Sequence, residues 1–169
     1  MMGNSELVSA ILQAADGEIV GKIRLQKIVY LLEQAGLQSG FAFSYHHYGP
    51  YSEDVATALT FAEIVDGSVI EGTRTTSRGF TFATYSLAEG FSVERATVGQ
   101  LGFDAARSLI ATMKAETSIV IELAATIHWL KYKERVAEWR TELVRRKTSK
   151  ATNEFTERAL VLLEALRLA

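Results

Sequence analysis

Cysteine is absent from this 169-residue sequence, so disulfide bonds and thiolate metal sites are excluded. The absence fits a reducing compartment, and we expect a cytoplasmic protein. Residues 1–6 lack the basic and then apolar regions of a signal peptide, so none is expected. The longest apolar stretch, 119–130, is too short and too polar to span a membrane, and no membrane partner is expected.

The sequence also lacks a large excess of either charge, because its formal net charge is only −2. Its distribution is uneven. Residues 1–70 carry three Lys/Arg against eight Asp/Glu, whereas residues 131–150 carry eight against three. Such asymmetry either steers a partner or reflects an internal match between the basic segment and the acidic N-terminal part. We favour the internal match, since charged helix faces are usually just solvated.

Hydrophobic periodicity predicts a mainly α protein of the α+β class. Helices are expected over residues 5–15, 22–35 and 52–65, and throughout the chain from Thr97 onward. Ser5 is expected to cap the first helix, and Val55, Leu59, Ala62 and Val65 to form the buried stripe of the third. Two strands at 68–70 and 79–85 are joined by a polar hairpin tip.

Three helices followed by a two-stranded hairpin is the order of a winged helix-turn-helix. We therefore predict a winged-helix-like core over residues 1–90 and a C-terminal helical bundle over 97–169 packed on it. With 48% apolar and 22% charged residues, the composition suits one globular domain over 1–169.

The only proline of the chain lies in a segment rich in tyrosine, residues 45–52. Pro50 fixes its own φ and keeps Gly49 out of the helical region, so the backbone is stiff here. Stiff tyrosines suit both a core corner and a contact surface, because each buries area at low entropic cost and carries a hydroxyl. We favour a structural corner with one tyrosine exposed. Ser52 is expected to cap the third helix.

Candidate catalytic and metal-binding groups are few. His46 and His47 are adjacent in an extended segment, so their side chains point to opposite faces and are poorly placed to chelate one metal. Glu53 and Asp54 could act as acid and base, but helix N-termini ordinarily recruit acids. Hydrolase and nucleotide-binding motifs are missing. We therefore predict no metal, no cofactor and no enzymatic activity, with an enzyme that uses these acids or histidines as a third hypothesis.

The winged-helix order raises DNA binding as an alternative. Its third helix usually enters the major groove, yet here that segment carries three acids and no Lys or Arg, so it would meet phosphate repulsion. A DNA-binding regulator would have to use the hairpin tip and the basic segment. The residues of this alternative site are Arg74, Arg78, Arg145, Arg146 and Lys147.

Two motifs carry a family resemblance. Residues 21–32 resemble the "G-x-x-x-LQK-h-h-Y-hL" helix (h, apolar) of the YwgA-like proteins and the related Panacea, or SocA-like, antitoxin domains. Residues 43–52 resemble their "F-x-Y-h-x-YGPYS" segment, at matching spacing. The full YGPYS segment and the long helical tail place the chain closer to the YwgA-like side.

The resemblance implies a bacterial or phage-related protein that binds another protein, in Panacea-type members a toxin, and no catalytic residues come with it. Our leading hypothesis is a non-enzymatic protein-interaction module, with a homodimer through the C-terminal helix as a further expectation. The signature helix and the corner should lie together, with Lys27 or Arg24 hydrogen-bonding around the corner. The partner-binding or signature residues are Arg24, Gln26, Lys27, Tyr30, Tyr45, His47, Tyr48, Gly49, Pro50, Tyr51 and Ser52.

Overall fold

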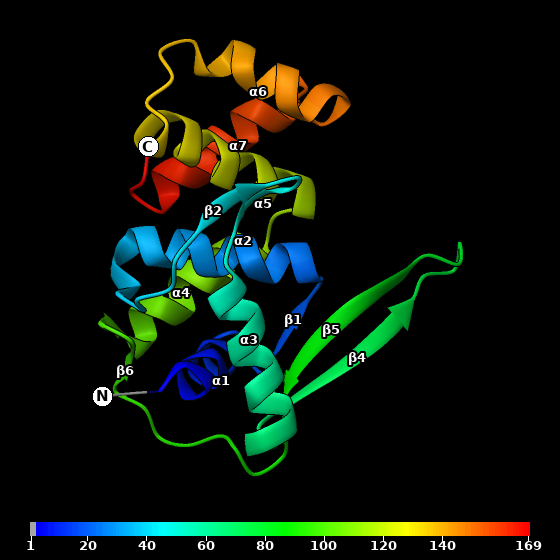
Figure 1. Cartoon of the computed structure of the whole chain (residues 1–169), viewed down its shortest axis with the longest axis vertical. Coiled ribbons are helices and arrows are strands. Elements are labelled where there is room, and N and C mark those ends of the chain that lie inside the picture. Colours follow the sequence, from blue (N-terminus) through cyan, green and yellow to red (C-terminus); the bar gives the residue numbers. More distant parts are fainter. Residues whose placement is uncertain (1–2) are drawn as a thin grey trace.

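The structure is a computed structural model that describes residues 3–169 (Figure 1). The prediction about an N-terminal signal peptide involves Met1 and Met2, which lie outside the described residues. The N-terminal elements are α1 (Asn4–Ala14), β1 (Glu18–Val20), α2 (Lys22–Leu32), η1 (Glu33–Leu37), β2 (Ser44–His46), β3 (Gly49–Tyr51), α3 (Glu53–Phe61), η2 (Ala62–Asp66), β4 (Val69–Thr75) and β5 (Thr81–Leu87). The C-terminal elements are β6 (Thr97–Val98), β7 (Leu101–Gly102), α4 (Phe103–Lys114), α5 (Ser118–His128), η3 (Trp129–Lys133), α6 (Trp139–Lys147), η4 (Thr148–Lys150) and α7 (Asn153–Ala165).

Two helices form the centre of the molecule. In α2 every residue from Leu25 to Leu32 is buried, and in α5 every residue from Val120 to His128 is buried. The two helices pack on each other, while α1 and α3 lie on one side and α6 and α7 on the other (Figure 1). A helix that is buried on all sides lies in the core, so α2 is central to the fold even though two of its buried residues, Gln26 and Lys27, are polar.

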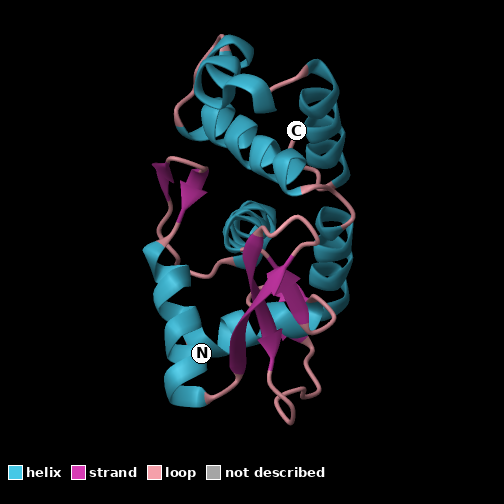
Figure 2. Ribbon diagram, turned by 90° about the vertical axis from the view of Figure 1, so that its right-hand side faces the viewer, coloured by secondary structure: helices cyan, strands magenta, loops and turns pink. Residues whose placement is uncertain are grey.

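Strands β1, β5 and β4 form a three-stranded antiparallel sheet in that order. Figure 2 shows this sheet apart from the small β2–β3 hairpin, and in Figure 1 the distal part of β4–β5 projects away from the helices. The α+β, mostly helical class is therefore confirmed. Its winged-helix assignment stays a prediction.

Several local expectations were wrong. Residues 97–102 form the short β6–β7 pair instead of helix, and β1 and the β2–β3 hairpin lie where only connections were expected. The first helix begins at Asn4 after Gly3, without a side-chain cap from Ser5. These strands have two to three residues each, too few for a period of two to be seen.

The phase of the third helix also departs from the expectation. After Phe61 the backbone continues as the π-helical turn η2, so the residues that follow are rotated relative to an α-helical register. Val55, Leu59 and Ala62 are buried as predicted, but Val65 is exposed. The predicted buried stripe is correct up to the π turn and wrong beyond it.

No helix in residues 3–169 has the length and apolar character needed to cross a membrane. The leucine-rich stripe of α7, which suggested a homodimer, is covered within the chain: Ala159, Leu162, Leu163 and Leu166 are buried, and α7 packs on α5. The observation that suggested a homodimer therefore has an intramolecular explanation.

Candidate functional site

The tyrosine-rich segment folds as the β2–β3 hairpin and is tied to α2 by buried hydrogen bonds. Gln26 donates from Nε2 to the Ser52 carbonyl at 3.0 Å and accepts from the Ser52 amide at 2.9 Å. The Lys27 ammonium donates to the Pro50 carbonyl at 2.7 Å. The prediction that the signature helix and the corner lie together, with Lys27 bonded around it, is confirmed.

Burial divides the signature residues into two groups. Gln26, Lys27 and Tyr30 are all at most 2% exposed, so they are not available to a partner. Gln26 and Lys27 hold the hairpin, whereas Tyr30 bonds to His128. Arg24 donates to the Lys114 carbonyl instead of the corner. The buried signature residues therefore serve to stabilise the fold around the hairpin. Its proposed role in partner binding stays a prediction for the exposed members.

Gly49 explains why the hairpin sits so close to α5. Its φ is +102°, and a Cβ added there would lie 2.8 Å from Oγ1 of Thr126 and 3.6 Å from Cε of Lys27. Only glycine tolerates both the backbone conformation and the close approach. Pro50 beside it is buried, and Ser52 caps α3 by accepting from the Val55 amide.

A buried ionic cluster lies beneath the hairpin. The Glu122 carboxylate, on α5, is 3.3 Å from the Lys147 nitrogen and 3.2 Å from the Lys150 nitrogen. The Lys147 side chain is 3% exposed, and its nitrogen makes no hydrogen bond to the described residues. Burial lowers the pKa of Lys27 to about 8, while Glu122 opposes that shift and Lys147 and Lys150 add to it.

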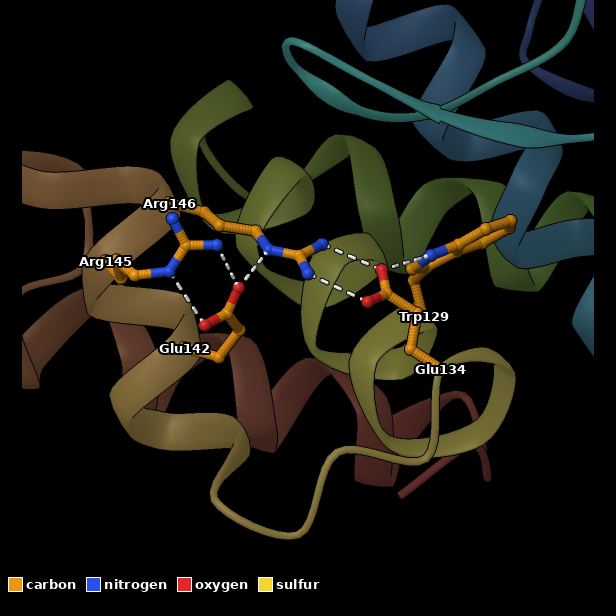
Figure 3. Close-up of polar contacts among 5 residues, drawn as sticks. All are labelled: Trp129, Glu134, Glu142, Arg145 and Arg146. Atoms are coloured by element: carbon orange, nitrogen blue, oxygen red, sulfur yellow. Dashed lines mark hydrogen bonds and ion pairs between the residues drawn. The ribbon is translucent and has the colours of Figure 1, made fainter.

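Arg146 joins two acids at the surface beside the cluster (Figure 3). Its guanidinium binds Glu134 through two nitrogens at 2.7 and 2.8 Å and Glu142 through Nε at 2.6 Å. Arg145 also donates to Glu142, and Trp129 donates to Glu134. The hydrogen bond from Arg145 and that from Arg146 lower the pKa of Glu142 to about 2.

These contacts show that the predicted pairing of the basic segment was wrong. The basic segment 131–150 pairs with glutamates of the C-terminal half, including Glu122, Glu134 and Glu157, and not with the acidic N-terminal part as favoured from the sequence. The acidic character of residues 1–70 is therefore left without that internal partner.

The aromatic rings of the corner lie against these cations. Arg146 is 4.6 Å from the ring centroid of Tyr45, and Lys150 is 5.1 Å from that of Tyr48. Such cation–π contacts stabilise the hairpin further. Tyr48 is exposed and Tyr45 and Tyr51 are partly buried, which confirms the expectation of one exposed tyrosine.

The histidines have separate environments. His46 and His47 are exposed at the hairpin tip, whereas His128 is buried and its Nδ1 lies 2.9 Å from the Tyr30 hydroxyl. Burial lowers the pKa of His128 to about 4. Within residues 3–169, His, Asp and Glu side chains form no group of three or more that could hold a metal ion.

The residues of the DNA-binding alternative are mostly engaged. Arg74 makes a two-oxygen contact with Glu18 at 2.8 and 2.9 Å, Arg145 and Arg146 pair as described, and Lys147 is buried. Arg78 is exposed at the tip of the β4–β5 hairpin. The structure does not bring these five residues to one free surface, and DNA binding stays a prediction.

An exposed apolar surface lies on the outer side of α3 and η2 and was missed from the sequence. Phe61, Ile64 and Val65 are 50%, 75% and 63% exposed. They line a shallow groove of about 420 Å³ together with Glu53, Ala56, Thr57 and Thr60. We call this surface the α3–η2 face. The signal that could have revealed it is the run Phe61-Ala62-Glu63-Ile64-Val65, which has more apolar residues than one helix face can bury.

A second hollow, of about 340 Å³, lies where α2 and α5 begin. The first turn of α2 has no side-chain cap, so no side chain accepts from its first amides, and helix N-termini of this kind suit anions. Lys22, Arg24 and Lys150 bring cations to the lining, Glu122 brings an acid, and Phe82 and Ile119 supply apolar surface. Sequence analysis did not identify this hollow, because it joins residues distant in the chain.

No protein-family model matches the chain. The chain is 26% identical over 153 residues to the uncharacterized protein YwgA of Bacillus subtilis, a match that covers 89% of each protein. This similarity supports a YwgA-like relationship. The Panacea part of the resemblance remains an expectation.

A second relative is the DNA ADP-ribosyl glycohydrolase of Thermus aquaticus, 28% identical over 134 residues. The match covers 76% of this chain and 35% of that protein, so the chain spans about a third of that relative's length. Our prediction of no enzymatic activity was wrong to exclude enzymes, because this similarity points toward an enzymatic relationship.

Proposed function

We propose that this chain is a protein-interaction module and that the α3–η2 face is its binding surface. The observation that carries the proposal is the gathering of three exposed apolar side chains, Phe61, Ile64 and Val65, along one turn of helix over a groove. Contiguous exposed apolar surface commonly marks an interaction site in a folded protein. A toxin, the partner implied by the Panacea resemblance, is one protein that would fit this role.

The rest of the molecule supports this use of the face. Ser52 caps α3, Gln26 fixes the Ser52 backbone from the central helix, and Val55 and Leu59 anchor the inner side of α3 in the core. The outer side is therefore presented on a rigid element, which lowers the entropic cost of binding.

Affinity capture with matched variants tests the proposal. A protein identified by mass spectrometry should be recovered with the wild type and with Val161→Ala, an equally exposed apolar position on α7, and lost with Phe61→Ala plus Ile64→Ala. Tyr48→Ala examines the hairpin tip favoured from the sequence. Equal recovery with the double variant and the wild type would refute the assignment of the face.

The second relative favours a second candidate function, recognition or hydrolysis of an ADP-ribosyl group on DNA. The hollow between α2 and α5 supports it, since uncapped helix amides with Lys22 and Lys150 suit phosphates and Phe82 suits a ring. Titration with ADP-ribose tests it. Binding that is lost in Lys22→Ala would support this candidate, and no binding by the wild type would eliminate recognition of the free nucleotide.

A further inference from the structure

The α3–η2 face is framed by acidic side chains. Residues 51–73 contain five acids and no Lys or Arg: Glu53, Asp54, Glu63, Asp66 and Glu71. Glu53 lines the apolar groove itself. Next to this groove, and sharing Ala56 and Thr60 with it, lies a hollow of about 140 Å³ between α3 and the β4–β5 hairpin. Glu63 and Glu71 line it, together with Lys22.

These acids are not neutralised within the fold. None of the five forms an ion pair with another of the residues 3–169, whereas Glu18, Glu122 and Glu134 in other parts of the molecule are each bound by Lys or Arg. Asp54 accepts a hydrogen bond from the Ala42 amide and Glu71 interacts with the Tyr85 hydroxyl, and neither contact supplies a positive charge. Their negative potential therefore extends outward around the apolar groove.

We propose that the partner of the α3–η2 face is a protein with a basic surface that surrounds an apolar contact. This inference rests on the proposed function and names the chemistry of the partner. Cationic side chains around the contact would meet Glu53, Glu63 and Glu71, while apolar side chains would cover Phe61, Ile64 and Val65. Charge complementarity of this kind raises association rates and excludes wrong partners.

The same charges disfavour other occupants. A nucleic acid would bring phosphates against five carboxylates without counterion release. A second copy of the chain, docked through the same face about a two-fold axis, would place the two acidic frames against each other. A basic protein with an apolar contact would both pair with the acids of the α3–η2 face and cover its apolar side chains.

A pair of short amphipathic helical peptides tests the inference. Both carry the same leucine pattern, with lysine in one and glutamate in the other at the remaining positions. Calorimetry should show that the lysine peptide binds and the glutamate peptide does not, with affinity that falls as salt is added. Methyl NMR signals of Ile64 and Val65 should shift on binding.

Charge variants separate a specific site from general attraction. Glu53→Gln with Glu63→Gln and Glu71→Gln should weaken the lysine peptide about ten-fold. The control removes the same charge from three exposed acids that also lack ion pairs to described residues, by Glu89→Gln, Glu94→Gln and Glu164→Gln, and should bind like the parent.

The outcomes distinguish this inference from the proposed function. Equal binding of both peptides, lost in the Phe61→Ala and Ile64→Ala variant, would preserve the apolar docking site and overturn the basic partner. Equal weakening by the control triple variant would overturn the inference as well. No peptide binding at all would overturn the basic partner, while affinity capture with the Phe61→Ala and Ile64→Ala variant would still decide the proposed function by itself. A dimer in light scattering that Phe61→Ala dissociates would show that a second copy is the occupant.

Discussion

Gly49 shows how a single residue sets the position of the hairpin. It combines a positive φ with an approach to Thr126 that leaves no room for a Cβ. Its neighbours Pro50 and Ser52 are each held by a hydrogen bond from α2. At this scale the sequence was informative, since the stiffness of the Gly-Pro pair and the role of Ser52 followed from residue type alone.

Gly49→Ala should destabilise the protein by about 3 kcal/mol, the sum of backbone strain at positive φ and overpacking against Thr126. Gly40→Ala is the matched control, because Gly40 also has a positive φ, +80°, but open space around it. Urea unfolding should show the smaller loss for Gly40→Ala. Equal losses would mean that the contact with Thr126 adds nothing.

Lys27 gives the protein a specific pH dependence of stability. The pKa of its ammonium falls to about 8 in the folded state from 10.5 in the unfolded chain, because it is buried. Between these values the unfolded state binds more protons, so the free energy of unfolding rises as the pH increases above about 8. Charged Lys27 thus opposes folding at neutral pH.

Lys27→Met should flatten this rise. Urea unfolding at several pH values between about 8 and 9 measures it, below the range where tyrosines of the unfolded chain, with an ordinary pKa of about 10, lose most of their protons. Lys147→Met serves as a comparison, since burial also lowers the pKa of that group. An unchanged slope in the Lys27 variant would show that the lysine is not responsible.

The α3–η2 element carries the main difference between the sequence-based expectation and the fold. An uninterrupted α-helix would put Val65 at the edge of the stripe that Val55, Leu59 and Ala62 form, but the π turn rotates it outward. Periodicity assumes one constant twist, so it cannot locate such a change. For the same reason we did not find the α3–η2 face from the sequence. We did find the two motifs, residues 21–32 and 43–52, that hold the tyrosine-rich segment in place.

A pair of identical substitutions tests the orientation of this element. Val55→Ala should cost about 2 kcal/mol, because a fully buried side chain loses two methyl groups and leaves a cavity. Val65→Ala should change stability by less than about 0.5 kcal/mol, since Val65 is exposed. Thermal or urea unfolding gives both values. A large loss at Val65 would place it in the core and remove the face.

At the scale of the whole molecule, the charge asymmetry has a different origin from the one expected. Much of the basic segment is paired with nearby glutamates, through Arg146, Lys147 and Lys150, while the acids around α3 form no ion pair with the described residues. Composition showed the asymmetry but not its pairing, because Glu122 and the lysines meet only through the packing of α5 and α6. The unpaired acids and the exposed apolar side chains of α3 and η2 together form the surface that we propose as the binding site.

Site-specific photo-crosslinking in cells that make the protein tests the central claim most directly. A benzoylphenylalanine at Phe61 should form an adduct with a basic protein, and the same probe at the exposed control position Val161 should not. Identical adducts at both positions, no adduct at Phe61, or an adduct there only with a second copy of the chain would contradict the assignment of the α3–η2 face as a docking site for a basic partner.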